Sequence, residues 1–383
     1  MADYEVLIVG GGPVGAALAL ALRDGGLAVG LLEARGAGLA RSDPRPIALA
    51  YGSRLILERL GIWESLQPVT PIMRIHVSQR GGFGRVELSA AEARLPALGY
   101  VVDYARLAGT LAHALEAAVG DYLTESTVTG LPVEADAASV QFKRGEDVRR
   151  VTARLVALAD GGAMGEVTRV RTRDYHQAAV TARVSSGLPH RNVAYERFTP
   201  EGPLALLPSG EALALVWTTT PEHAQELCTL PETGFLQRLQ EAFGRRLGQF
   251  RAVGARTWFP LALRVASEVA GPRVVAVGNA AQTLHPVAGQ GFNLGLRDAW
   301  ELATVIRACG REEIGGAAML EAYRARRRLD RGGGVWFTDT LVRLFSNDIA
   351  PLRLARGLGL AVLGAAPPAK DFVVRRMTFG ARG

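Results

Sequence analysis

Three glycines near the N-terminus have the spacing of a turn that binds a pyrophosphate. Gly10, Gly12 and Gly15 follow the mostly apolar residues 4–9 and precede a stretch rich in alanine and leucine. In this arrangement the first glycine permits a tight turn, and the second lets the backbone approach the phosphates. The third lets the following helix pack closely on the strand. The pattern therefore predicts a strand, a phosphate-binding turn and a helix.

Two further residues extend this prediction to a dinucleotide. Pro13 suits the first turn of the helix, whose free N–H groups and positive dipole end favour phosphate. Glu33 ends the next apolar run, where a carboxylate can accept hydrogen bonds from a ribose diol. The motif alone does not distinguish FAD from NAD.

A second glycine-rich segment lies far along the chain. Residues 274–298 contain an apolar run, a loop of small residues, a glycine-rich turn and a predicted helix that begins at Gly291. So many small residues indicate close approach of the backbone to a ligand. The helix dipole suits a flavin, which becomes anionic on reduction.

These motifs need a βαβ arrangement to position them. Residues 4–9 and 28–33 are predicted strands on either side of a helix over 14–23, which predicts an α/β fold. From about residue 175 to 219, short alternating strands separated by Pro and Gly predict an inserted antiparallel sheet. After Gly291 the pattern is mostly helical. The remaining predicted elements are helices over 51–60, 103–119 and 232–243, strands over 151–159 and 273–277, and two short strands within 72–87.

Composition excludes several classes of protein. A chain of 383 residues that is 48% hydrophobic can bury a large core and is not disordered. Cys228, Cys309 and the six scattered histidines lack metal-ligand spacing, so no metal site is expected. The net charge of +7 raises the question of nucleic acid, but RRM, KH and zinc-finger patterns are absent and no nucleic-acid partner is expected. The start is acidic and the apolar run 6–22 is broken by glycines, so we expect a cytoplasmic protein without a membrane span.

Three segments together resemble the group A flavoprotein aromatic hydroxylases, which have the para-hydroxybenzoate hydroxylase fold. They are the two glycine-rich motifs and Asp160-Gly161, which is similar to the family's middle Asp-Gly motif. Within this family the closest resemblance is to the ubiquinone-biosynthesis hydroxylases. It is carried by residues 43–49 (DPRPIAL), 194–198 (AYERF), 202–208 (GPLALLP), 278–298, 338–339 (TD) and 344–347 (LFSN). At Gly278-Asn279 most of the superfamily has Gly-Asp, and Asn is similar to the branch that acts on 2-polyprenyl-6-methoxyphenol.

The resemblance implies a reaction and its participants. NADPH or NADH reduces FAD, O2 adds at the flavin C4a position, and the resulting hydroperoxide hydroxylates a polyprenylated phenol. The alternatives are a sister hydroxylase that acts at another ring position, a flavin reductase, and an FAD-holding subunit without catalysis. Subunits of a ubiquinone-biosynthesis complex are expected partners, and the oligomeric state stays open.

The resemblance also implies a domain division. A discontinuous FAD-binding domain takes residues 1–71, 96–174 and 270–330. An antiparallel-sheet substrate domain takes 72–95 and 175–269, and residues 331–383 form a C-terminal helical region.

Four residues are candidates for catalysis by this resemblance: Arg45, His285, Pro286 and Gln290. Arg45 is expected near the flavin and its phosphates, with Asp43 positioning its loop. His285 has two interpretations, packing at the flavin edge or proton transfer. The residues expected to hold the cofactor are Gly10, Gly12, Pro13, Val14, Gly15, Glu33, Ala34, Arg35, Arg45, Arg106, Val128, Asp160, Gly161, Gly278, Asn279, Pro286, Gly289, Gln290, Gly291, Phe292 and Asn293.

The sequence departs from the family after Asp160-Gly161. The family usually continues with a Ser and then an Arg, where this chain has Met164 and Val167. In the sheet region, Glu196 and Arg197 are expected to form an ion pair.

The C-terminal region has a second possible role. Residues 332–379 are helical in pattern and rich in Leu and Arg, with Arg353 and Arg356 on one predicted helix and Arg375 and Arg376 on the next. A basic amphipathic surface of this kind can lie on an anionic membrane, here the inner membrane. The alternative is that these helices cover the FAD domain or form an oligomer interface.

Overall fold

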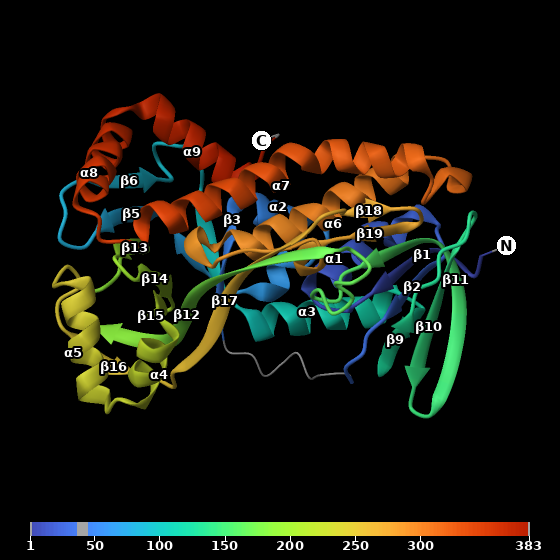
Figure 1. Ribbon diagram of the computed structural model, residues 1–383, viewed down its shortest axis with the longest axis horizontal. Helices are drawn as coiled ribbons and strands as arrows, with labels where there is room; N and C mark the ends of the chain where they lie inside the picture. Colours follow the sequence, from blue (N-terminus) through green and yellow to red (C-terminus); the bar gives the residue numbers. More distant parts are fainter. Residues whose placement is uncertain (1, 37–44, 382–383) are drawn as a thin grey trace.

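The computed structural model describes residues 2–36 and 45–381, and Figure 1 shows two sheets joined by long strands. Asp43 and Pro44, two residues of the expected flavin loop, lie outside the described residues.

The first sheet has the order β18 (Ala270–Gly271), β19 (Val274–Ala276), β11 (Asp147–Leu158), β1 (Tyr4–Val9), β2 (Val29–Leu32) and β8 (Asp121–Leu123). Two more strands extend it: β10 (Ala138–Arg144) pairs with β11, and β9 (Ser126–Gly130) pairs with β10.

The centre of the first sheet is parallel and buried on both faces. β1 pairs in parallel with β2 and with β11. Val6 and Ile8 of β1 pack under helices α1 (Pro13–Leu22), α3 (Tyr104–Ala118) and α6 (Gln290–Ala308). Leu7 and Val9 face the other side, toward β10. Burial on both faces explains why residues 6–9 of β1 are all apolar.

The second sheet is mainly antiparallel. Its order is β20 (Gln282–Thr283), β17 (Thr257–Ala266), β12 (Val170–Ser186), β15 (Ala212–Thr219), β14 (Gly202–Ser209), β13 (Val193–Thr199), β5 (Arg74–Gln79) and β6 (Arg85–Ser89), with β16 (Phe250–Val253) paired to β12. Helices α4 (Pro221–Thr229) and α5 (Glu232–Phe243) cover one face. The other face lines a cavity.

A small third sheet lies between the two and was not predicted. It consists of β3 (Pro46–Ala50), β7 (Gly99–Asp103) and β4 (Thr70–Ile72). Helix α2 (Tyr51–Arg59) follows β3 directly. β4 has only three residues, and β3 and β7 have five each.

Three helices complete the chain: α7 (Ala317–Phe345), α8 (Ala350–Ala365) and α9 (Pro367–Phe379). Figure 1 shows α7 running along much of the molecule, with α8 and α9 folding back beside the β5–β6 hairpin. Within the described residues, no single helix is long and apolar enough to span a membrane. The pair α8 and α9 passes that test by length and composition, although the two helices are bent by 96°.

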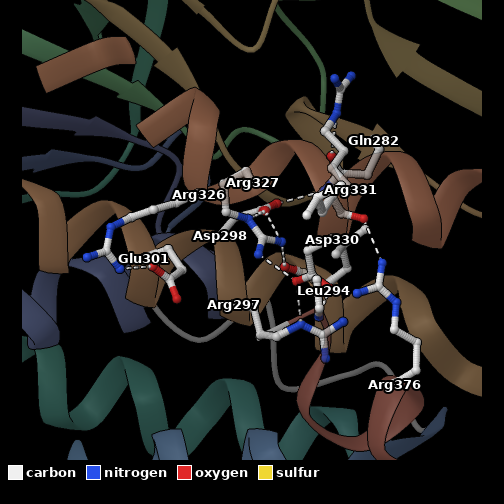
Figure 2. Close-up of polar contacts among 12 residues, drawn as sticks. Gln282, Leu294, Arg297, Asp298, Glu301, Arg326, Arg327, Asp330, Arg331 and Arg376 are labelled. Carbon is white, nitrogen blue, oxygen red and sulfur yellow. Dashed lines mark hydrogen bonds and ion pairs between the residues drawn. The ribbon is translucent and has the colours of Figure 1, made fainter. Parts of the chain in front are cut away.

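A buried charge network holds α6 against α7 (Figure 2). Asp330 of α7 accepts hydrogen bonds from Arg297 of α6 at 2.9 Å and from Arg327 at 2.6 Å. Asp298 of α6 accepts from Arg327 at 2.7 Å. Removing one partner of such a network leaves an uncompensated buried charge, which is strongly destabilising. The network therefore fixes α6, whose first turn lies in the cofactor region.

Most predicted elements are confirmed, and so is the α/β fold with an antiparallel sheet and C-terminal helices. Helix α5 has the predicted bounds of 232–243, and β1 those of 4–9. The first of the short strands predicted between about 175 and 219 is longer than expected, because β12 extends over Val170–Ser186. Its exposed half pairs with β17, so periodicity alone underestimates its length.

Candidate active site

One cavity of about 1240 Å³ connects the glycine-rich turns of the first sheet to the open face of the second sheet and to α7, α8 and α9. Many of the predicted cofactor residues line it. They are Gly10, Gly12, Pro13, Val14, Glu33, Ala34, Arg35, Arg45, Val128, Asp160, Gly161, Gly278, Asn279, Pro286, Gly289, Gly291 and Phe292. The other predicted residues, which do not belong to the lining, are Gly15, Arg106, His285, Gln290 and Asn293.

The first glycine turn has the geometry of a phosphate cradle. A Cβ on Gly10, whose φ is +108°, would lie 2.5 Å from the carbonyl oxygen of Ala159. A Cβ on Gly15 would lie 1.9 Å from the carbonyl oxygen of Gly10. Gly12 differs, because a Cβ there would meet no atom within 4 Å and would project into the cavity. Gly10 and Gly15 are thus required by the fold, and Gly12 leaves space for a ligand.

Glu33 has a structural role that the sequence did not reveal. One carboxylate oxygen accepts a hydrogen bond from the Gly11 N–H at 2.7 Å. The other accepts from the backbone N–H of Arg35 at 2.9 Å and from its guanidinium at 3.0 Å. A carboxylate has about four lone-pair sites, so capacity remains for a ribose hydroxyl. Glu33 connects the glycine turn to the end of β2.

The second glycine-rich loop packs directly on the first. Gly278 adopts φ +61°, and a Cβ added to it would lie 3.1 Å from the side chain of Val14. Gly289 has φ +59° and precedes α6. A Cβ on Gly291 would meet nothing within 4 Å, as at Gly12. The start of α6 therefore also leaves room for a ligand beside its free N–H groups.

Asn293 positions this loop through its side chain. Its amide oxygen accepts from the Ala50 N–H and from the Ser53 hydroxyl, both at 2.7 Å. Its amide nitrogen donates to the carbonyl oxygens of Ala48 at 2.9 Å and Gly289 at 2.7 Å. All four hydrogen-bonding positions of the amide are occupied. Asn293 holds the β3–α2 connection against the second loop.

His285 is buried, with 1% of its surface exposed. Its Nδ1 accepts from the Val287 N–H at 3.1 Å, and its ring packs edge-on against Tyr175. Burial lowers the pKa of His285 to about 3, so the imidazole is neutral. This geometry favours the packing interpretation of His285 over proton transfer.

The Asp160-Gly161 segment forms a closed loop. Asp160 accepts from the backbone N–H groups of Gly162 at 3.0 Å and Met164 at 2.6 Å. Arg264 of β17, which sequence reasoning missed, donates to the Gly162 carbonyl oxygen at 3.2 Å. Arg264 gives no local signal, because it stands in an otherwise ordinary strand.

The two remaining predicted arginines differ in position. Arg45 lines the cavity, with its guanidinium carbon 5.4 Å from the ring centre of Phe259 and 6.0 Å from that of Tyr104. Arg106 is exposed on α3 and donates to the Pro68 carbonyl oxygen at 3.3 Å. Gln290 is the first residue of α6.

The predicted ion pair between Glu196 and Arg197 is wrong. Neighbouring residues of a strand point to opposite faces of the sheet. Arg197 donates to the Ala242 carbonyl oxygen of α5 at 3.1 Å, on the covered face. Glu196 lines the cavity on the other face.

Comparison with known proteins identifies the cofactor that this geometry serves. A family model described as FAD binding domain matches residues 3–331. Ubiquinone hydroxylase UbiL of Rhodospirillum rubrum is 38% identical over 384 residues, covering 97% of this chain and 88% of that protein. The chain belongs to the family of FAD-dependent ubiquinone hydroxylases. The 3-demethoxyubiquinol 3-hydroxylase of Escherichia coli is 34% identical, with 93% of each protein covered.

A solved structure shows the same fold. The p-nitrophenol 4-monooxygenase PnpA of Pseudomonas putida superposes with a TM-score of 0.76 and 18% identity, over 99% of each chain. The resemblance to the para-hydroxybenzoate hydroxylase fold is thus confirmed.

Membership of this family resolves the ambiguity of the first motif in favour of FAD. The protein is a flavin-dependent monooxygenase that uses NAD(P)H as reductant and O2 as co-substrate. The described residues fit the cofactor, because the glycines at positions 12 and 291 leave open space beside two helix N-termini in one cavity.

Proposed function

We propose that this protein hydroxylates the ring of a polyprenylated phenol in ubiquinone biosynthesis, with 2-polyprenyl-6-methoxyphenol as the substrate. The observation that carries the proposal is the continuous cavity. Its volume of about 1240 Å³ exceeds the roughly 300–1,000 Å³ that is usual for one small ligand. A cavity of this size accommodates a cofactor together with a long substrate.

The end of the cavity away from the glycine turns suits an apolar tail. Its lining from α7, α8 and α9 is mostly aliphatic and aromatic, including Phe337, Leu341, Leu344, Leu360, Leu363, Val373 and Met377. Each CH2 group transferred from water to such a lining contributes roughly 0.8 kcal/mol. A prenyl chain therefore binds here more favourably than a small polar phenol would.

The chain's own residues have definable tasks in this reaction. Bound FAD supplies the redox chemistry that activates O2 for transfer to the ring. Gly12 and Gly291 allow the cofactor to approach the backbone closely. Glu33 holds the first glycine-rich loop in position, and Asn293 holds the second. The apolar lining excludes water. The activated oxygen is therefore transferred to the ring and not lost to water.

The test uses purified FAD-loaded protein with NADPH, O2 and 2-polyprenyl-6-methoxyphenols of different tail length. We expect a product one oxygen atom heavier and O2 uptake in step with product. A flavin reductase would oxidise NADPH and consume O2 without that product, and an FAD-holding subunit would leave its flavin oxidised. Quinone intermediates in a deletion strain would distinguish this ring position from those of sister hydroxylases.

We also propose that α8 contacts a membrane surface peripherally. Leu354, Leu358 and Val362 are 59%, 58% and 65% exposed and follow one another at intervals of four residues, on one face of the helix. Ala355 and Gly359, which are also exposed, line the cavity. A tail that enters beside these two small residues would come directly from the lipid.

The basic face expected from the sequence is partly wrong. Arg356 is buried and donates to the carbonyl oxygens of Leu344, Phe345 and Asn347 at the end of α7. Arg376 donates to the Leu329 carbonyl oxygen at 2.7 Å. The Arg356 guanidinium is thus bound at the end of α7 and that of Arg376 at a carbonyl oxygen in the middle of α7. The apolar stripe therefore becomes the main support for membrane contact.

Co-sedimentation with phosphatidylglycerol vesicles tests this contact. Replacing Leu354 and Leu358 by Asp should leave the protein in the supernatant, while wild type pellets. Val148→Asp is the control, because Val148 is 65% exposed on β11, far from α8. Equal pelleting of all three proteins would contradict the proposed contact.

A further inference from the structure

The open face of the second sheet is apolar around one carboxyl group. Glu196 of β13 stands between Ala194 and Phe198 on the cavity side of its strand. Its partners across the sheet are Ala205 of β14 and Val77 of β5. Neither of these side chains can hydrogen-bond the carboxyl group, and Glu196, which is half-buried, lines the cavity in which a ring would bind.

Glu196 is also without a partner. It makes no hydrogen bond or ion pair with any described residue, and its Oε1 is fully buried. An unpartnered buried carboxyl group costs stability, and an apolar residue would pack there more favourably. Stability therefore does not explain a glutamate at this position, and a ligand does.

The other acid and base groups of the cavity are already used. Charged residues that line it from other elements are Glu33, Arg35, Arg45, Asp160 and Arg356. Glu33 and Asp160 accept hydrogen bonds from their own loops. His76 of β5 pairs in register with Tyr195, the neighbour of Glu196 on the other face. None of these groups shifts the pKa of Glu196, which burial alone raises to about 8.

We propose that Glu196 is the catalytic base that accepts the proton of the phenol hydroxyl group. This inference rests on the proposed function. The phenol O–H bond breaks, the proton moves to a carboxylate oxygen of Glu196, and the electron pair stays on the phenol oxygen. The ring carbons thereby become more nucleophilic toward the transferred oxygen. When the hydroxylated carbon later loses its hydrogen as a proton to water, Glu196 returns its proton to the ring oxygen and is regenerated as the carboxylate.

The pH dependence has a definite sign. A base must be ionised, and the ionised fraction of Glu196 increases as the pH rises through about 8. General-base catalysis typically contributes about 10²–10⁴-fold, most effectively when the pKa lies near the working pH. The hydroxylation rate of wild type should therefore increase with pH up to this value.

The test compares Glu196→Gln with Glu211→Gln, a matched control at the exposed β14–β15 turn of the same sheet. Single-turnover hydroxylation of a prenylated methoxyphenol should fall by at least about 100-fold in Glu196→Gln and lose its rise through pH 8, whereas Glu211→Gln keeps both. A ring-fluorinated analogue, whose phenol is more acidic, should restore most of the rate. Infrared difference spectra of wild type minus Glu196→Gln, without NADPH, should show a carboxylic acid that titrates near pH 8.

Three outcomes would overturn the inference. They are an unchanged rate and pH profile in Glu196→Gln, an equal loss with the fluorinated analogue, and a carboxyl group that is already ionised at neutral pH. Substrate affinity and FAD content of the variant, measured separately, identify a loss caused by misfolding. If wild type itself hydroxylates no prenylated phenol, the proposed function fails, while the infrared titration still reports on Glu196.

Discussion

Arg327 of α7 and Asp298 of α6 form a salt bridge of 2.7 Å in which the two side chains are only 3% and 2% exposed. Asp298 also accepts a hydrogen bond from the backbone N–H of Gly278 at 3.1 Å. One carboxylate thus connects the long C-terminal helix with the second glycine-rich loop (Figure 2). The conformation of the second glycine-rich loop and the packing of α7 therefore depend on the same carboxylate.

Replacing Arg327 by Met should destabilise the protein by about 3–5 kcal/mol, because it leaves the buried carboxylate of Asp298 without a cation. The neighbouring Arg326 offers a matched control. It pairs with Glu301 at 2.8 Å but is 36% exposed, so Arg326→Met should cost no more than about 1 kcal/mol. Chemical denaturation of both variants measures the difference. Equal losses would mean that the buried network contributes no more than a surface pair.

Gly12→Val should abolish FAD binding and leave the fold intact. The added side chain projects into the cavity and meets no protein atom nearby, so it excludes the cofactor alone. Gly120→Val, at another position where a Cβ meets nothing within 4 Å, is the control and should retain FAD. Flavin absorbance and circular dichroism of the purified variants give the answer. A yellow Gly12→Val protein with full occupancy would place the pyrophosphate elsewhere.

Glu33→Ala should weaken FAD binding by about 1.5–3 kcal/mol for each hydrogen bond lost to the ribose. Because Glu33 also holds the Gly11 N–H, some loosening of the glycine turn is expected as well. Titrating apo-protein with FAD and with FMN separates the two effects, since FMN lacks the adenosine ribose. A ribose contact predicts a loss for FAD alone, and equal losses for both ligands would assign Glu33 a structural role only.

The stability of wild type should fall as the pH rises from about 4.3 to about 8. The pKa of Glu196 is raised to about 8 in the folded protein, against about 4.3 in an unfolded chain. Its contribution to folding is therefore complete below the unfolded pKa and is lost as the pH rises through the folded pKa. Glu196→Gln should remove this dependence and be the more stable protein in alkaline buffer. Denaturation midpoints of the two proteins across this range, with FAD in excess, provide the measurement.

Local signals were sufficient for β1, α1 and β2, but not for β8, β9, β10 and β18 of the same sheet. β1, α1 and β2 were predicted to within one or two residues, because an apolar run, a glycine turn and a stop signal are all contained in a short stretch of sequence. Helix α5 was equally visible, since its apolar spacing ends at Gly244. The domain boundaries inferred from these elements stay a prediction.

Tertiary relationships could not be read in the same way. Arg356 has the sequence context of a surface cation, yet it donates to the end of α7, which only the fold brings near. Glu196 suggested an ion pair with its neighbour, because the sequence does not tell which face of β13 is covered by a helix. The hydrogen-bond partners of Asn293 are likewise distant, at Ala50 and Ser53.

Helix α8 presents one side to the cavity and the opposite side, with Leu354, Leu358 and Val362, to the outside. An α-helix with its side chains is only about 10–12 Å wide. On the proposed function, a prenyl tail that passes along α8 exchanges lipid for protein without crossing bulk water. An isoprene unit leaving water would gain roughly 4 kcal/mol, but one leaving a bilayer gains almost nothing. The preference for tail length should therefore be steep in detergent-free buffer and nearly flat on vesicles, so that the membrane, and not the cavity wall, sets the apparent KM.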